Sequence, residues 1–171
     1  AEAFHRRLED RAIQLNFAAS RDNLSGSVRT LSEHRGEAFR LMGLALAQPR
    51  FDAAPLARVR EAVLSGLRRA STNPNNLAGE TFAAMAYPDH PYGRRGNGTL
   101  ESVPAVTAED LKAVHGRMVA REHLKVTVVG DITPEDLAAA LDGVFGALPA
   151  RANLTDVPLV APRQGERRVI A

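Results

Sequence analysis

The chain has 171 residues, of which 44% are hydrophobic, and its formal net charge at pH 7 is +2. This size and composition fit one domain with its own core, or one lobe of a larger protein. The absence of cysteine excludes disulfides and thiolate-bound metals. No apolar run is long enough to span a membrane. Nucleic-acid binding is not expected, because the arginines are interleaved with acids and aromatics make up only 5% of the chain.

The first predicted elements are the end of a helix and a β-hairpin. Residues 2–11 are typical of a helix end. Apolar and polar residues then alternate through 12–31 around a turn at 21–23, which predicts two antiparallel strands. A helix from residue 32 or 33 to about residue 48 is expected next, because apolar residues recur there at helical spacing.

The clearest predicted helix lies within residues 51–75. Asp52 is its expected N-cap, and Pro55 falls in the first turn, where a missing N–H is tolerated. Gly66 interrupts the helix interior at a cost of about 1 kcal/mol relative to alanine. Close packing against a neighbouring backbone is the interpretation that general grounds favour for this glycine. One apolar stripe follows three- and four-residue steps: Leu56, Val59, Val63, Leu64 and Leu67.

The remaining sequence predicts three more helices and one strand. Asn73-Pro74 ends the preceding helix and can begin the next one, which is expected over 74–86. A long irregular connection at 87–106 follows, which is rich in glycine and proline. Thr107 is expected to cap a helix over 107–119, and Thr133 followed by Pro134 predicts a helix over 133–145. Between them, β-branched residues predict a strand at 124–129.

The order of these elements predicts an α+β fold in which helices pack against a mostly antiparallel sheet. We expect a single lobe over residues 1–150. The Pro-rich segment 151–171 is expected to be a linker that enters a further strand and leads towards another lobe.

The polar residues do not form a self-contained active site. The five histidines show neither His-x-x-x-His nor His-x-x-Glu-His spacing, so each is expected to have a surface or packing role. These are His5, His34, His90, His115 and His123. No G-x-S-x-G elbow, phosphate loop or cysteine nucleophile is present. Four glutamates lie in different local contexts, and nothing in the sequence pairs any two of them as general acid and base. These are Glu61, Glu80, Glu101 and Glu109.

An ordered set of motifs resembles the insulinase/pitrilysin-type metallopeptidases, also called inverted zincins. The resemblance covers residues 3–160 approximately. It implies that this chain is the second part of one α+β lobe, whose first strands and first helix would precede Ala1. The motifs are PRFD (49–52), ARVREAVLSGL (57–67), YPDHPYG (87–93), TAEDLKAVH (107–115), VTVVGDIT (126–133) and FGALP (145–149).

The resemblance also implies where a zinc site would be expected. Family members combine an inverted His-x-x-Glu-His motif with a glutamate on a helix that resembles residues 55–70, and that helix usually carries two glutamates seven residues apart. The matching positions here are Val59 and Gly66, and neither is a zinc ligand. Glu61 is the nearest carboxylate, but it would point about 140° away around the helix. The inverted motif would fall before Ala1.

These features together lead us to expect a non-catalytic subunit or inactive lobe of an insulinase-like zinc metallopeptidase. Such a lobe would help a catalytic subunit or lobe to form a peptide-binding chamber. The resemblance implies no catalytic residue and no metal ligand in this segment, with zinc held by the partner. It further implies that a peptide substrate adds as a strand along Phe17, Ala18 and Ala19. An ordinary hairpin end is an equally good interpretation of these three residues.

Two other functions remain open at this point. The chain could be the degenerate half of a single-chain active zinc peptidase, or a structural core-type subunit without peptidase activity. Its own enzymatic status is therefore left undecided. The Ala- and Arg-rich, Lys-poor composition is typical of a GC-rich bacterial genome. Bacterial relatives are often exported, so we expect a periplasmic protein, with the cytoplasm as the alternative.

Overall fold

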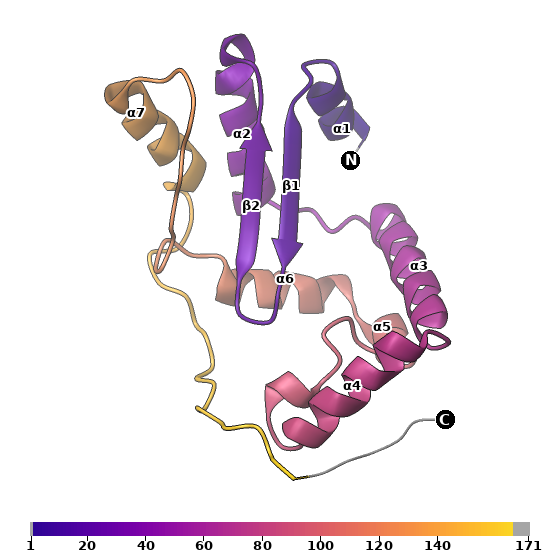
Figure 1. Ribbon diagram of the computed structural model, residues 1–171. Helices are drawn as coiled ribbons and strands as arrows, with labels where there is room; N and C mark the ends of the chain where they lie inside the picture. Colours follow the sequence, from indigo (N-terminus) through magenta and orange to yellow (C-terminus); the bar gives the residue numbers. More distant parts are fainter. Residues whose placement is uncertain (1, 166–171) are drawn as a thin grey trace. The chain divides into compact units, whose positions relative to one another are not determined.

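The computed structural model describes residues 2–165. The chain forms two compact units, each considered by itself (Figure 1). The first unit combines the residues up to Asp52 with 108–154, and the second combines 53–107 with the residues from 155 onwards. The sequence predicts that the linker enters a further strand at its RRVIA end, and these residues lie outside the described part of the chain.

The first unit contains a β-hairpin and four α-helices within the described residues. Its elements are α1 (Glu2–Glu9), β1 (Gln14–Ala19), β2 (Leu24–Arg29), the 3₁₀ helix η1 (Ser32–His34), α2 (Arg35–Ala47), α6 (Ala108–Met118) and α7 (Pro134–Phe145). The two strands pair antiparallel, and Phe17 is opposite Gly26. The predicted hairpin and the helices on either side of it are therefore confirmed.

A small hydrophobic core joins the hairpin to α1 and α2. Ile13, Ala38 and Leu41 are buried at its centre. Partly buried side chains of α1 and β2 pack around this centre: Phe4, Leu8 and Val28. An inward-facing apolar side chain of β2 thus packs against the apolar face of α2, as expected for a sheet face that is covered by a helix.

Helices α2 and α7 pack closely in the same unit. A Cβ atom added at Gly43 of α2 would lie 3.2 Å from both Gly143 O and Val144 Cα of α7. Val144 itself is buried. Because the glycine has no side chain, the two helix backbones approach each other directly at this point.

The second unit is helical within its described residues. Its elements are α3 (Ala53–Ala70), α4 (Pro74–Ala86), the 3₁₀ helix η2 (Pro91–Gly93) and the short α5 (Ser102–Ala105). Helix α4 has the predicted bounds, because Asn73 Oδ1 accepts hydrogen bonds from the amides of Asn75 and Asn76 and Pro74 begins the helix. The predicted irregular connection at 87–106 instead contains η2 and α5.

The predicted strand at 124–129 is wrong for the described residues. The segment is extended in appearance in Figure 1, but it is not part of the sheet, whose only described strands are β1 and β2. A sequence pattern specifies which residues favour a strand, whereas a strand forms only when another strand accepts and donates the backbone hydrogen bonds. Within residues 2–165, no helix has the length and apolar content that a membrane crossing requires.

Candidate functional site

The predicted substrate-binding segment lies on β1. Phe17, Ala18 and Ala19 are the last three residues of this strand, and all three are exposed. Among the described residues, β1 pairs with β2 along one edge and its other edge has no strand partner. A free edge of this kind presents backbone N–H and C=O groups with which an extended peptide can pair.

The register of the hairpin decides which backbone groups face outward. The Ser20 amide donates to Asn23 O at 2.8 Å across the turn. Hydrogen-bonded and non-hydrogen-bonded pairs alternate in an antiparallel ladder. The Ala18–Ser25 pair is therefore hydrogen-bonded, and the N–H groups of Phe17 and Ala19 point to the free edge. Of the three predicted residues, therefore, only Phe17 and Ala19 direct their backbone amides to the free edge, whereas the Ala18 amide pairs with β2.

Phe17 is held in place by a residue that sequence reasoning did not identify. Its ring lies over Gly26, where an added Cβ atom would be 2.9 Å from Phe17 Cε1. The Cε atom of Met42 would lie 3.5 Å from the same point, on the α2 side of the hairpin. A glycine inside a predicted strand is the signal that could have indicated this close approach.

The two positions that the resemblance matches to zinc ligands, Val59 and Gly66, lie on α3. Val59 is 61% exposed, so it does not belong to the buried part of the predicted stripe, where Leu64 is 6% exposed. A Cβ atom added at Gly66 would meet only Arg69 Nη2, at 4.0 Å. The predicted close packing at Gly66 is therefore wrong among the described residues, because no backbone lies near enough to require a glycine.

The donor chemistry on α3 does not fit zinc. The isopropyl group of Val59 and the hydrogen of Gly66 provide no oxygen, nitrogen or sulfur ligand. Within residues 2–165, no group of three or more histidine, aspartate or glutamate side chains is arranged to hold a metal ion. We therefore derive no catalytic step through a metal bound to this chain.

The more buried histidines have structural partners instead. His115 Nε2 is 2.8 Å from Leu46 O, near the end of α2. His90 is buried, its Nδ1 accepts from the Tyr92 amide at 3.1 Å, and its Nε2 is 2.9 Å from Pro158 O. Since Nδ1 accepts a hydrogen bond, the proton of a neutral His90 ring is on Nε2, which donates to Pro158.

Comparison with known proteins gives a consistent result. The family model described as the peptidase M16 inactive domain matches residues 105–171. The crystal structure of a peptidase M16 inactive domain from Pseudomonas fluorescens has a TM-score of 0.86 and 29% sequence identity, and the alignment covers 94% of this chain and 39% of that one. Pitrilysin has the same fold, with a TM-score of 0.79 and 19% identity over 94% of this chain and 18% of its own.

The chain is thus similar to the insulinase/pitrilysin-type peptidases, M16, in sequence over residues 105–171 and in fold over most of its length. A Helicobacter pylori protein named as a non-peptidase homolog is 26% identical over 87% of this chain and 34% of its own length. An uncharacterized zinc protease of Mycobacterium leprae is 33% identical over 52% of this chain and 20% of its own length. The chain spans about a third or less of the length of these two relatives. Its predicted α+β fold is confirmed by the structural matches.

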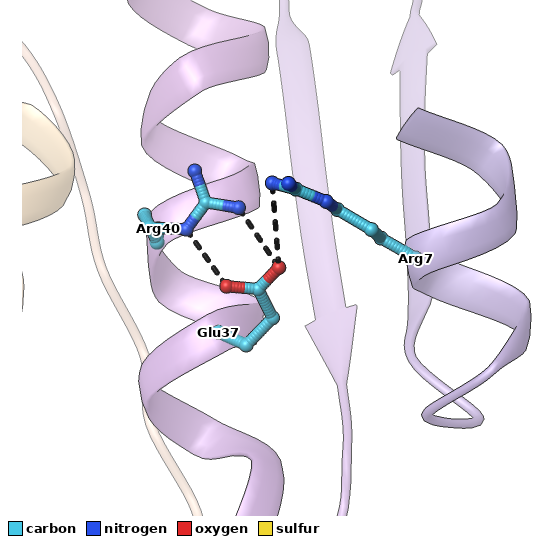
Figure 2. Close-up of polar contacts among 3 residues, drawn as sticks. All are labelled: Arg7, Glu37 and Arg40. Carbon is cyan, nitrogen blue, oxygen red and sulfur yellow. Dashed lines mark hydrogen bonds and ion pairs between the residues drawn. The ribbon is translucent and has the colours of Figure 1, made fainter. Parts of the chain in front are cut away.

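The sequence did not predict a charged cluster that lies in the first unit. Figure 2 shows Glu37 between two arginines. Arg40 donates hydrogen bonds of 2.7 and 2.8 Å to its carboxylate, and Arg7 of α1 lies 4.0 Å away. The hydrogen bonds from Arg40 lower the pKa of the Glu37 carboxyl below its ordinary value. The cluster connects α1 to α2, and the spacing of three residues between Glu37 and Arg40 was its only sequence signal.

Proposed function

We propose that this M16 lobe is a non-catalytic subunit or lobe that pairs with a zinc-containing catalytic M16 lobe and lines a chamber for peptide substrates. The observation that carries the proposal is the chemistry of α3, which keeps its helical form while the two ligand positions are Val59 and Gly66. A catalytic lobe would need a carboxylate on this helix to complete its zinc site. The zinc protease name of the M. leprae relative supports zinc in the partner.

We further propose that the free edge of β1 contributes to peptide binding in that chamber. A bound peptide would add as a strand and accept hydrogen bonds from the outward amides of Phe17 and Ala19. Main-chain pairing does not depend on the peptide's side chains, so this edge would contribute affinity without strong sequence preference. The exposed position of all three segment residues leaves the edge accessible within this unit.

The pairing with a catalytic lobe is tested by the zinc content of the purified, full-length protein. We expect a zinc-to-protein ratio near zero and peptide hydrolysis only after the catalytic M16 partner is added. One zinc per chain would contradict a separate non-catalytic subunit. It would instead indicate the degenerate half of a single-chain active peptidase. Stable association with redox subunits and no peptidase activity in any mixture would indicate the structural core-type alternative.

The edge-strand proposal is tested with a matched pair of substitutions in the active complex. Ala19→Pro removes an outward N–H, and Ala18→Pro removes an N–H that pairs with β2. We expect Ala19→Pro to raise the KM for peptides while the thermal stability of the lobe changes little. Ala18→Pro is expected to lower the stability of the hairpin. An unchanged KM for the Ala19→Pro complex would exclude peptide pairing at this edge.

The proposed compartment is the bacterial periplasm, the site at which exported M16 relatives would meet peptides. Cell fractionation with an antibody against the lobe tests this directly. Recovery of the protein in the osmotic-shock fluid is the expected result, and recovery only with cytoplasmic marker enzymes would contradict it.

A further inference from the structure

The face of α3 that holds Gly66 also carries an arginine that is folded over this glycine. Arg69 Nη1 donates a hydrogen bond of 2.8 Å to Ser65 Oγ, one turn earlier in the helix. Arg69 Nη2 lies 4.0 Å from the point that a Cβ atom of Gly66 would occupy. The guanidinium group thus lies over Ser65 and Gly66, beside a position that the resemblance matches to a zinc-ligating glutamate.

The positive charge of Arg69 is not neutralised within the described residues. Its hydrogen-bond partner is the uncharged Ser65 hydroxyl, and it forms no ion pair with any residue of 2–165. Glu80 of α4 is already paired with Arg95 at 2.9 Å. A guanidinium group has several N–H donors, and the bond to Ser65 uses one of them. Arg69 can therefore bind an anion while it keeps its contact with Ser65.

A second arginine lies on the same face of α3. Arg58 precedes Arg69 by eleven residues. This separation is about three helical turns, so the two side chains leave the helix on the same side, about 16 Å apart along its axis. Arg58 is exposed and has no hydrogen-bond or ion-pair partner within residues 2–165. The residues between them on this face, Ala62 and Ser65, are small, so no large side chain separates the two charges.

The other charged residues of α3 do not balance these two arginines. The helix contains four arginines and one glutamate. Arg60 donates to Val106 O at 2.7 Å, so it holds α3 against the segment after α5. Arg68 points about 100° around the helix from the next arginine. Glu61 lies three residues after Arg58, but the two form no ion pair in the structure. This face of α3 is therefore positively charged.

We propose that Arg58 and Arg69 bind two carboxylate side chains of an acidic peptide that lies extended along α3. We call this pair of arginines the carboxylate site. A guanidinium group matches a carboxylate both in charge and in bidentate geometry. An extended chain advances about 3.3 Å per residue, so about 16 Å corresponds to acidic residues about five positions apart. The carboxylate site rests on the proposed function, because it names the peptides that a chamber-lining lobe would favour.

The spacing of the arginines also decides which carboxylates are bound. The C-terminal carboxylate of a peptide would engage only one arginine of the pair. Two side-chain carboxylates on an extended peptide engage both, so they gain two charge-assisted contacts from one bound chain. The expected ligand is therefore an internal acidic segment and not a free C-terminus.

Gly66 contributes to the carboxylate site because it leaves Arg69 available. A glutamate at position 66 would lie three residues before Arg69, a spacing at which opposite charges pair on a helix surface. Its carboxylate would compete with the peptide for the guanidinium group. Glycine removes this competitor and leaves the space beside Arg69 open.

Equilibrium binding of labelled peptides to the purified, full-length protein, without a catalytic partner, tests the proposal. One synthetic peptide carries two glutamates five residues apart, and the matched peptide carries glutamines at the same positions. At low ionic strength we expect the glutamate peptide to bind about fivefold more tightly, and this preference should fade as salt screens the charges. Fluorescence anisotropy measures both affinities. Equal affinities, or no binding of either peptide, would overturn the carboxylate site.

Substitutions on α3 test whether the preference depends on these two arginines. Arg69→Gln and Arg58→Gln should each reduce the preference by about half or more, whereas Arg68→Gln removes the same charge from another side of the helix and should leave it unchanged. Gly66→Glu should also reduce the preference, and Gly66→Gln should retain it. Thermal unfolding checks that each variant is folded. A preference that survives Arg69→Gln, or that Arg68→Gln lowers equally, would overturn the proposal.

Hydrolysis separates the failure of the carboxylate site from the failure of the proposed function. If both peptides are cleaved with equal kcat/KM once the catalytic partner is added, the lobe acts in a peptidase and the carboxylate site is wrong. If the glutamate peptide binds preferentially but no mixture cleaves either peptide, the carboxylate site is supported and the proposed function is contradicted.

Discussion

The ring of Phe17 lies across Gly26 on the paired strand, so closely that an added Cβ atom would be 2.9 Å from Phe17 Cε1. This contact fixes the side chain of one of the two residues whose amides face the free edge of β1. It also explains why a glycine is accommodated in the middle of β2, where it would otherwise weaken a strand.

The contact predicts a specific double-mutant result. We expect Gly26→Val to lower the free energy of unfolding by about 1–3 kcal/mol, because the new side chain overlaps the Phe17 ring. In the Phe17→Ala background the same substitution should cost less, since the overlapping ring is absent. Urea denaturation of the four variants measures the difference. Equal costs in both backgrounds would show that the ring does not constrain Gly26.

A larger side chain at Gly43 should separate helices α2 and α7. We expect Gly43→Leu to lower the free energy of unfolding by about 1–3 kcal/mol, because backbone atoms of Gly143 and Val144 would lie 3.2 Å from its Cβ. Thermal unfolding followed by circular dichroism measures this loss. Gly36→Leu is the matched control, since a Cβ atom there meets nothing within 4 Å. Comparable losses in both variants would contradict the close approach.

Gly66 should tolerate a side chain. We expect Gly66→Ala to raise the free energy of unfolding by about 0.5–1 kcal/mol, because alanine favours the helix and the added methyl group has room. Chemical denaturation of the full-length protein is the measurement. A loss of stability would mean that a segment outside residues 2–165 packs against this glycine. That result would restore the close-packing interpretation.

The Glu37 cluster predicts a pH-dependent contribution to stability. Since folding lowers the pKa of Glu37, its contribution is fully present above the unfolded value of about 4.3 and is lost as the pH falls through the folded value. We expect Glu37→Gln to cost about 1 kcal/mol at pH 7, and the difference from wild type to shrink below pH 4 or so. Urea denaturation at several pH values measures it.

The control for Glu37 is another glutamate of the same unit. Glu9 is exposed and forms no ion pair within residues 2–165, so Glu9→Gln should change stability little at any of these pH values. A Glu37→Gln cost that persists unchanged at low pH would show that the carboxylate charge is not its cause.

His90 is predicted to hold the segment that follows residue 154 against α4 and η2. His90→Ala removes both the bond to Pro158 O and the acceptor for the Tyr92 amide. We expect protease cleavage within 155–165 to become faster, whereas His5→Ala, at an exposed position of α1, should have no effect. Limited proteolysis with mass spectrometry measures the cleavage rate. An unchanged rate would show that other contacts, such as the Arg163 amide to Ala86 O, suffice.

Local chemistry in the sequence determined much of the secondary structure. The Asn73-Pro74 and Thr133-Pro134 pairs predicted the starts of α4 and α7, because a capping side chain followed by proline acts within one turn. Alternating apolar residues predicted the hairpin for the same local reason. The sequence alone also shows that positions 59 and 66 carry no carboxylate, because this depends only on residue identity.

Only the tertiary structure decided the features that depend on distant neighbours. Residues 124–129 have the composition of a strand but no described partner, and pairing is a property of two segments rather than one. The periodicity placed Val59 in the apolar stripe, yet it is exposed, because burial requires another element to cover that face. The outward direction of the Phe17 and Ala19 amides followed from the hairpin register. The sequence thus determined the local elements and the absence of a metal-binding side chain at positions 59 and 66, while register and packing decided which edges and faces remain free among the described residues.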